Sequence, residues 1–256
     1  MKKFLLLGHN GYLGSYLLNS LDCDILDGRK LYNNSFKYQF IINCIGKPDL
    51  EYCEINQDET LYSNALIIED IKKNYPESKI INFSSYYVYN DIGLCNEQSN
   101  TTIKYAYCRQ KILGEQLNIN GLNFRIGKLF GNHLSSQNKL TEHILKNDRL
   151  EIDTVTFNPT SVYCISELLK NYDFLNKNFG IYNLSNRGVV SHYEYALFIN
   201  NFLNKNKFII KSDKNVRPFE NYGKFTMDIS KINKLVDIES WENDMKNYLQ
   251  KVGSNL

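Results

Sequence analysis

A short apolar stretch that runs into three evenly spaced glycines opens the sequence and constrains the fold more than any other feature. Phe4–Leu7 is continuously apolar, as a central parallel strand buried on both faces would be. Glycines follow at positions 8, 11 and 14, and apolar residues then recur at helical spacing. A strand, a glycine-rich turn and a helix in this order predict a dinucleotide-binding unit, with the helix N-terminus facing the pyrophosphate.

Each glycine of this loop has its own predicted role. Gly8 permits the sharp turn, Gly11 leaves room for a pyrophosphate against bare backbone, and Gly14 lets the helix lie close to the strand. The spacing is G-x-x-G-x-x-G rather than G-x-G-x-x-G, so the position between a strand and a helix carries the interpretation. The predicted cofactor-binding residues of the loop are Gly8, Asn10, Gly11, Tyr12, Leu13 and Gly14.

Length and charge exclude several classes of protein. The 256 residues suffice for one large domain, or for a Rossmann unit plus a smaller lobe. The net charge is +2 and the Lys and Arg residues are scattered, which gives no support for a nucleic-acid partner. The apolar run of Phe4–Leu7 is too short for a signal-peptide core or a membrane span, so we expect a cytoplasmic protein with no membrane association.

The cysteine pattern argues against a metal site or a disulfide framework. The six cysteines contain no C-x-x-C pair and have no metal-ligand spacing with the four histidines. We therefore expect reduced and mostly buried thiols, and no metal.

The residues after the second predicted strand bear on the choice of cofactor. Cys23–Leu26 reads as a short strand, and Asp27, Arg29 and Lys30 follow it. An acidic side chain in this place accepts hydrogen bonds from the ribose hydroxyls of NAD, whereas a basic one pairs with the 2'-phosphate of NADP. Asp27 and Arg29 point to different cofactors, with a slight lean toward NADPH.

Two further apolar strands are expected to end at the ligand-binding edge of the sheet. Residues 40–46 form one of them and end in Cys44, Ile45 and Gly46, where the cofactor would pass; a helix follows at about 60–73. Residues 79–83 form the other and deliver Ser84, Ser85 and Tyr86. Ligands of open α/β sheets bind at the carboxyl ends of the strands, so Ser85 is a candidate for the site.

Further along the chain, Tyr107 and Lys111 carry side chains that could act together with this serine. They are four residues apart in a stretch, residues 105–118, that has a helical pattern, so both project from one face. A free phenol has a pKa near ~10. A neighbouring ammonium and an oxidised nicotinamide ring would favour the phenolate and lower that pKa, which suits proton transfer. Tyr105 competes for the role, but four residues on it meets Arg109 rather than a lysine.

The sequence resembles the extended short-chain dehydrogenase/reductase family, and within it the dTDP-4-dehydrorhamnose reductase branch. The resemblance covers nearly the whole sequence. FSSYYVY (83–89) resembles S-T-D-Y-V-F, and YCRQKILGE (107–115) resembles Y-G-x-x-K-x-x-G-E. FRIGKLFG (124–131) is similar to R-T-S-W-V-Y-G, and FNPTSVYCISELL (157–169) to a segment with G-x-P-T. The stretch 41–65 also matches and places Asn64 on the family's asparagine.

The resemblance implies residue roles. Ser85, Tyr107 and Lys111 would be catalytic, and Asn64, Tyr107 and Lys111 would join the cofactor site. The predicted substrate-binding residues are Ser85, Tyr86, Tyr107, Pro159, Thr160 and Arg217. Tyr86 and Tyr87 replace the acids found in related 4,6-dehydratases, which disfavours a dehydratase. The metal-bridged dimer of some members is not carried over, because its acidic ligands have no counterpart that we can place, although a homodimer is compatible with the resemblance.

The expected fold is α/β: a Rossmann doubly wound parallel sheet in residues 1–130, and a smaller substrate-binding lobe in residues 131–256, with some return of the chain to the Rossmann core. The expected activity is NAD(P)H-dependent reduction of a nucleotide-linked 4-keto-6-deoxy sugar, in the synthesis of polysaccharide or glycoconjugate precursors. Two alternatives remain open. One is a nucleotide-sugar epimerase of the same family, and the other is a non-catalytic regulatory subunit that binds NAD(P).

Overall fold

The computed structural model describes residues 2–26, 37–133, 139–212 and 225–253. Three residues of the predicted sites, Asp27, Arg29 and Arg217, lie outside this described part, as does Lys30.

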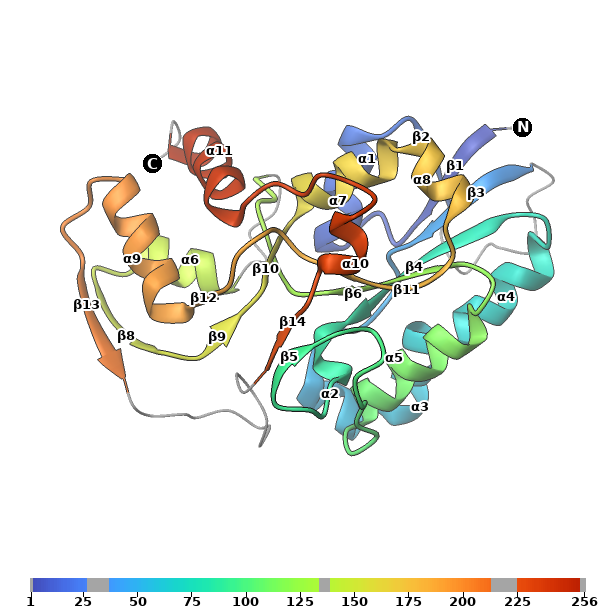
Figure 1. Cartoon of the computed structure of the whole chain (residues 1–256), viewed down its shortest axis with the longest axis horizontal. Helices are drawn as coiled ribbons and strands as arrows, with labels where there is room; N and C mark the ends of the chain where they lie inside the picture. Colours follow the sequence, from blue (N-terminus) through green and yellow to red (C-terminus); the bar gives the residue numbers. More distant parts are fainter. Residues whose placement is uncertain (1, 27–36, 134–138, 213–224, 254–256) are drawn as a thin grey trace.

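Within the described residues, six strands form one parallel sheet at the centre of the fold (Figure 1). In spatial order they are β11 (Gly180–Leu184), β6 (Leu122–Ile126), β4 (Lys79–Ser85), β3 (Tyr38–Asn43), β1 (Lys2–Leu7) and β2 (Cys23–Leu26). Each neighbouring pair is parallel. From β1 the chain adds β2 on one side of the sheet and then β3, β4, β6 and β11 on the other side, so the direction of winding changes between β1 and β3. This order is typical of doubly wound sheets and confirms the predicted fold class.

Helices cover both faces of the sheet because the strands are apolar on both faces. Phe4 and Leu6 of β1 pack against helices α1 (Tyr12–Ser20) and α7 (Val162–Lys170). On the same face lie α8 (Tyr172–Lys177) and α10 (Ser230–Asn233). Leu5 and Leu7 point the other way, toward α4 (Ile67–Asn74) and the end of α5 (Ala106–Leu117). Figure 1 shows α4 and α5 together below the sheet and α1 with α7 above it.

The connection from β3 to β4 differs from the single helix predicted at about 60–73. It contains α2 (Leu50–Ile55), α3 (Gln57–Leu61), a π-helical turn η2 (Tyr62–Leu66) and then α4. The predicted strand at residues 40–46 also ends earlier, at Asn43, so Cys44–Gly46 form the loop beyond it. After β4, a 3-10 turn, η3 (Tyr86–Val88), leads to β5 (Gly93–Cys95), which pairs with β14 (Phe225–Met227).

A second apolar core lies beside the sheet, at the left of Figure 1. Its elements are α6 (Lys139–Lys146), β8 (Arg149–Asp153), β9 (Thr156–Phe157), β12 (Val190–Ser191), α9 (His192–Phe202), β13 (Phe208–Ser212) and α11 (Trp241–Gly253). Trp241 packs between Tyr195 and Phe198 in this core, in keeping with a packing role. The strand pair β7 (Lys128–Phe130) and β10 (Pro159–Ser161) connects the two cores.

The chain returns from the second core to the sheet. Helices α7 and α8 and strand β11 all contribute to the first core, although they follow residue 130. The division into residues 1–130 and 131–256 therefore describes the order of the chain better than it describes two separate cores.

Candidate active site

The glycine loop lies against the loop that follows β3. Gly8 has a φ of +77°, and a Cβ atom there would meet the backbone of Cys44 at 2.6 Å. Gly14 is equally constrained, because its Cβ would lie 2.1 Å from the carbonyl oxygen of Gly8. At Gly11, by contrast, the nearest described atom to an added Cβ is that same oxygen at 3.4 Å, so the space in front of Gly11 is open. This is the cradle that a pyrophosphate at the N-terminus of α1 requires.

The loop after β3 is fixed by buried amides. Asn43, the last residue of β3, accepts a 3.2 Å hydrogen bond from the N–H of Ile45. The Asn64 side chain accepts from the N–H of Lys47 at 2.8 Å and donates to its carbonyl at 3.2 Å. A Cβ at Gly46 would lie 3.1 Å from Asn64 Oδ1 and 3.3 Å from the Nζ of Lys111. Gly46, Asn64 and Lys111, three residues of the predicted cofactor site, are thus close together.

The π-helical turn η2 places Asn64 in this position. Asn64 donates to the Oε1 of Gln110 at 2.8 Å, and Gln110 donates in turn to the Oγ1 of Thr60 at 2.9 Å. These bonds join η2 to helix α5 next to Lys111, and α5 and η2 are in extensive contact. Single π turns inside helices are frequent at functional sites. Asn64 came from the family resemblance, whereas Gln110 was missed by the sequence analysis.

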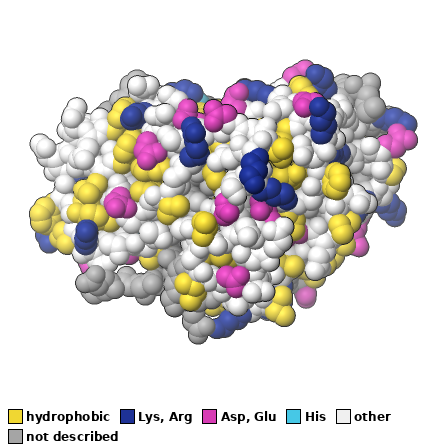
Figure 2. Space-filling view, in the orientation of Figure 1, with side chains coloured by type: hydrophobic (Ala, Val, Ile, Leu, Met, Phe, Trp, Pro, Cys, Tyr) yellow, Lys and Arg dark blue, Asp and Glu magenta, His cyan; other side chains and the backbone are white. Residues whose placement is uncertain are grey.

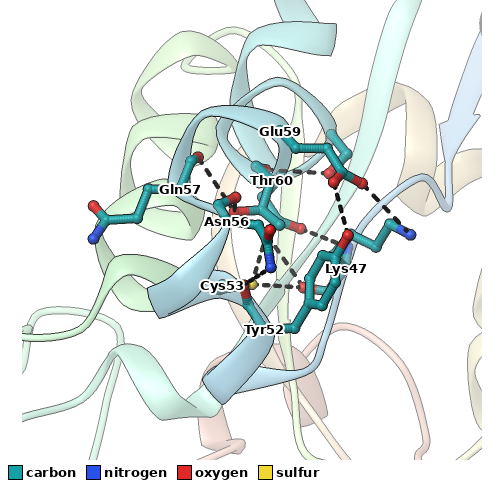
Figure 3. A network of polar contacts seen from close by, with 9 residues as sticks. Lys47, Tyr52, Cys53, Asn56, Gln57, Glu59 and Thr60 are labelled. Atoms are coloured by element: carbon teal, nitrogen blue, oxygen red, sulfur yellow. Dashed lines mark hydrogen bonds and ion pairs between the residues drawn. The ribbon is translucent and has the colours of Figure 1, made fainter.

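Asn64 also contacts a neighbouring network of polar side chains, since its amide lies 3.6 Å from Sγ of Cys53. Figure 3 shows this network around Cys53 and Thr60. The thiol of Cys53 donates to the carbonyl of Lys47 at 3.3 Å, and the hydroxyl of Thr60 donates to the carbonyl of Asn56 at 2.8 Å. At its edge the phenol of Tyr52 donates to Glu59 at 2.7 Å. The network fixes α2, α3 and the Lys47 backbone, which holds the loop after β3 in place.

Ser85, Tyr107 and Lys111 come together at the carboxyl end of β4, and all three are buried. Ser85 accepts a 3.2 Å hydrogen bond from the N–H of Tyr87, and its hydroxyl also hydrogen-bonds the Tyr107 phenol. Lys111 donates to the carbonyl of Phe83 at 3.0 Å, and its Nζ lies 5.8 Å from the centroid of the Tyr107 ring. Helix α5 positions Tyr107 and Lys111 one turn apart, as their spacing predicted.

The electrostatics differ from the expectation for Tyr107. Burial raises the pKa of the Tyr107 phenol, and the hydrogen bond from Ser85 lowers it by a smaller amount. In this structure desolvation of the phenolate outweighs its polar contacts, and the lowering expected beside an oxidised nicotinamide ring stays a prediction. Burial also lowers the pKa of Lys111 to about 8, while the nearby Cys53 and Glu115 act in the opposite direction. At neutral pH the Tyr107 phenol therefore carries its proton.

Three of the predicted substrate-binding residues, Tyr86, Pro159 and Thr160, are buried. Tyr86 is buried, stacked on Tyr87 with ring centroids 4.4 Å apart and edge-on to Phe225 at 5.8 Å. Thr160 is fully buried, and its hydroxyl accepts from the N–H of Gly127 at 2.9 Å and donates to a backbone carbonyl. Pro159 is buried beside it in β10. In this structure the Thr160 hydroxyl fastens β10 to the end of β6, so the structure provides no support for a direct substrate contact by it.

Sequence reasoning missed two sets of asparagines near the site. Asn132 is fully buried and donates to the carbonyl of Tyr12 at 2.6 Å, which ties the start of α1 to the segment after β7. Asn43, Asn82 and Asn123 lie in register on β3, β4 and β6 and are linked by side-chain hydrogen bonds of 3.1 and 3.2 Å. Single asparagines within apolar strands are visible in the sequence and could have indicated this ladder.

The described part of the chain offers no cluster of His, Cys, Asp and Glu that could hold a metal ion. Its helices are too short or too polar to cross a membrane. All six cysteines are described and are free thiols, four of them buried, as expected. On the face seen in Figure 2, positive and negative side chains are interspersed among polar and apolar ones.

The fold and the site together define a Rossmann-type α/β protein with a glycine-loop cradle and a serine, a tyrosine and a lysine at the carboxyl edge of its sheet. The sequence matches the RmlD substrate binding domain family over residues 1–254, and the chain belongs to that family. It matches none of the curated proteins with which it was compared.

Solved structures with this fold include several sugar-nucleotide enzymes. A dTDP-4-dehydrorhamnose reductase from Clostridium acetobutylicum superposes with a TM-score of 0.84 at 19% identity, covering 98% of this chain and 99% of the other. The same enzyme from Bacillus anthracis, in complex with NADP, gives 0.81 at 19% identity over 98% and 99%. A UDP-N-acetylglucosamine 4-epimerase from Methanobrevibacter ruminantium, in complex with UDP-N-acetylmuramic acid, gives 0.80 at 16% identity over 100% and 99%.

Proposed function

We propose that the protein is an NAD(P)H-dependent reductase that converts the keto group of a nucleotide-linked 4-keto-6-deoxy sugar to a hydroxyl. The observation that carries the proposal is the buried group of Ser85, Tyr107 and Lys111 next to the glycine-loop cradle. Membership of the RmlD substrate binding domain family and the likeness to dTDP-4-dehydrorhamnose reductases support the choice of substrate class.

The residues of the chain fit a dinucleotide. The open space at Gly11, together with the N-terminus of α1, would hold the pyrophosphate, and Gly46, Asn64 and Lys111 would line the ribose next to the nicotinamide. The lean toward NADPH rests on Arg29 and gains support from the NADP in the Bacillus anthracis structure. When bound, the nicotinamide supplies the hydride that adds to the carbonyl carbon of the sugar.

The side chains supply the proton and the orientation. Tyr107 donates its phenolic proton to the carbonyl oxygen, which becomes the new hydroxyl, while Ser85 turns its hydrogen bond from Tyr107 to that oxygen. Lys111 holds the ribose and, as a cation, compensates the phenolate left on Tyr107. The phenol carries this proton before hydride transfer, since burial keeps its pKa above neutral pH.

The second candidate is a nucleotide-sugar epimerase, which the Methanobrevibacter ruminantium structure favours. It would use the same three side chains but return the hydride to the sugar and keep its cofactor. A non-catalytic regulatory subunit is the weaker alternative, because the catalytic side chains are present and assembled. In either catalytic role we place the protein in the cytoplasm, in the supply of sugar nucleotides for polysaccharide or glycoconjugate synthesis.

The test is oxidation of NADPH and NADH by the purified protein with dTDP-, GDP-, CDP- and UDP-linked 4-keto-6-deoxy sugars. Consumption of a reduced cofactor with one nucleotide series would establish the reaction and the substrate. If the protein oxidises neither cofactor with any of these sugars, and if a cofactor stays bound to it through purification, the epimerase is favoured instead.

A further inference from the structure

Three polar side chains outside the candidate active site form a continuous chain of hydrogen bonds. Nδ1 of His192 lies 2.7 Å from Oδ1 of Asp153, and Nε2 of the same ring lies 3.3 Å from Nζ of Lys128. His192 is fully buried, whereas Lys128 is only partly covered. The residues come from different elements: Lys128 starts β7, Asp153 ends β8 and His192 starts α9.

The partners determine the proton positions in this chain. An ammonium group only donates, so Nε2 of His192 must accept from Lys128. The ring therefore carries its proton on Nδ1 and donates it to Asp153. The Phe157 ring packs against the imidazole with centroids 4.8 Å apart and planes tilted by 35°, and the Lys128 ammonium lies 5.6 Å from the Phe157 centroid. The result is a cation held in a defined place by a buried imidazole and a carboxylate.

A series of contacts places the Lys128 ammonium just beyond the carboxyl end of β6, the strand that pairs with the Ser85 strand β4. Ser85 pairs in register with Ile126, the last residue of β6, and Lys128 follows two residues later as the first residue of β7. The N–H of Lys128 donates to the carbonyl of Asn158 at 3.0 Å. Asn158 is hydrogen-bonded at 2.8 Å to Met227 of β14, the strand whose Phe225 packs on Tyr86. Lys128 thus lies beyond the end of β6, between the sheet and the second core.

We propose that Lys128, positioned by His192 and Asp153, is a substrate-binding residue that recognises an oxyanion of the sugar nucleotide. The proposal rests on the proposed function and deepens it, since a cation at this edge selects for a negatively charged group. Two sources share this chemistry: the diphosphate of any nucleotide sugar, and a carboxylate on the sugar itself, whose recognition at C6 would exclude a 6-deoxy sugar. His192 and Asp153 do not touch the substrate in this account and act only through Lys128.

The test is calorimetric binding of UDP-glucose, dTDP-glucose and UDP-glucuronic acid to the NADP-saturated protein. Loss of a charge-assisted hydrogen bond weakens binding by about 10- to 100-fold. If Lys128 holds the diphosphate, Lys128→Met weakens all three probes by that factor. If it holds a sugar carboxylate, the substitution weakens UDP-glucuronic acid alone. Equal affinities for Lys128→Met and the wild type, or a wild type that binds none of the probes, would overturn the proposal.

Control variants separate binding from folding. Lys128→Arg keeps the cation and should keep most of the affinity. Lys211, on β13 of the same core, lies over the ring of Tyr193 at 5.0 Å, and Lys211→Met should leave binding unchanged. Asp153→Asn should weaken binding less than Lys128→Met, and the double variant should bind as weakly as Lys128→Met alone, because both act through one ammonium. Additive losses in the double variant would contradict the positioning role.

These readouts do not depend on turnover. Probe binding that depends on Lys128, without reduction of any keto sugar, would support the oxyanion site and contradict the proposed reaction. Reduction of a keto sugar with unchanged kinetic constants in Lys128→Met would support the proposed reaction and contradict the oxyanion site.

Discussion

The ammonium of Lys111 donates a 3.0 Å hydrogen bond to the carbonyl oxygen of Phe83, and so joins the catalytic helix to the strand that carries Ser85. The bond holds a charged group inside the protein, where desolvation disfavours it. Burial lowers its pKa to about 8. The site therefore contains a cation whose charge changes close to physiological pH.

The first prediction concerns the pH dependence of cofactor binding. In the folded protein Lys111 loses its proton as the pH rises through about 8, so affinity for NADPH should fall above that pH. Fluorescence titrations with NADPH on either side of this pH measure the effect. Lys111→Met should bind more weakly at every pH and lose this component of the profile. An unchanged profile in that variant would assign the titration to another group.

The same lowered pKa has an opposite effect on stability. The unfolded chain keeps the Lys111 proton up to the ordinary pKa of about 10.4, whereas the folded protein loses it near 8. The unfolded state therefore binds more protons between these values, and this group should make the folded state more stable as the pH rises. Denaturant unfolding of the wild type should show this rise and Lys111→Met should lack it.

A second prediction concerns the proton donor. Tyr107→Phe removes the phenolic oxygen but keeps the buried ring, so the protein should fold and bind NADPH nearly as before. Turnover should fall by about 10²- to 10⁴-fold, the usual contribution of general acid catalysis. Tyr105→Phe, on the turn before the same helix, is the matched control and should keep its activity. Substantial activity in Tyr107→Phe would show that another group supplies the proton.

A third prediction separates the glycines of the loop. Gly11→Ala has room for its methyl group among the described atoms, so its free energy of unfolding should stay near that of the wild type. Its NADPH affinity should fall at least about 10-fold, because the methyl group would occupy the space of the pyrophosphate. Gly14→Ala should instead unfold the protein, since its Cβ would lie 2.1 Å from the oxygen of Gly8. Tight NADPH binding by Gly11→Ala would place the pyrophosphate elsewhere.

A fourth prediction concerns the ion pair that anchors helix α5. Glu115 and Arg125 are both buried and form two hydrogen bonds, of 2.9 and 2.7 Å. Glu115→Ala leaves the guanidinium unpaired and should cost about 3–5 kcal/mol of unfolding free energy. The double variant Glu115→Met with Arg125→Met should regain most of that loss. A cost below about 1 kcal/mol for the single variant would mean that water reaches the guanidinium.

Much of the fold could be predicted because its signals are local. Phe4–Leu7 is apolar on both faces, residues 79–83 are mostly apolar, and both form central strands, while the helical spacing of Tyr107 and Lys111 places both on α5. Once these strands and this helix are predicted, the location of their site residues is predicted too, because the carboxyl ends of parallel strands meet at one edge of the sheet.

The remaining features depend on contacts between distant residues. The π-helical turn at Asn64 has no pattern of its own and is held by Gln110, which is 46 positions away. The pKa of Tyr107 depends on how deeply the phenol is buried, which spacing does not reveal. The role of Thr160 in fastening β10 to Gly127 likewise becomes visible only when the chain has folded.

The central claim is that hydride leaves the cofactor for the sugar with a proton from Tyr107. The most direct measurement is reduction of the preferred keto sugar with NADPH that carries deuterium in place of both hydrogens at C4 of the nicotinamide, followed by mass spectrometry of the product. We expect one deuterium at the new carbinol carbon for each NADPH consumed, and formation of this product about 10²- to 10⁴-fold more slowly with Tyr107→Phe. A product without deuterium, formed while the NADPH concentration stays constant, would contradict it and identify an epimerase.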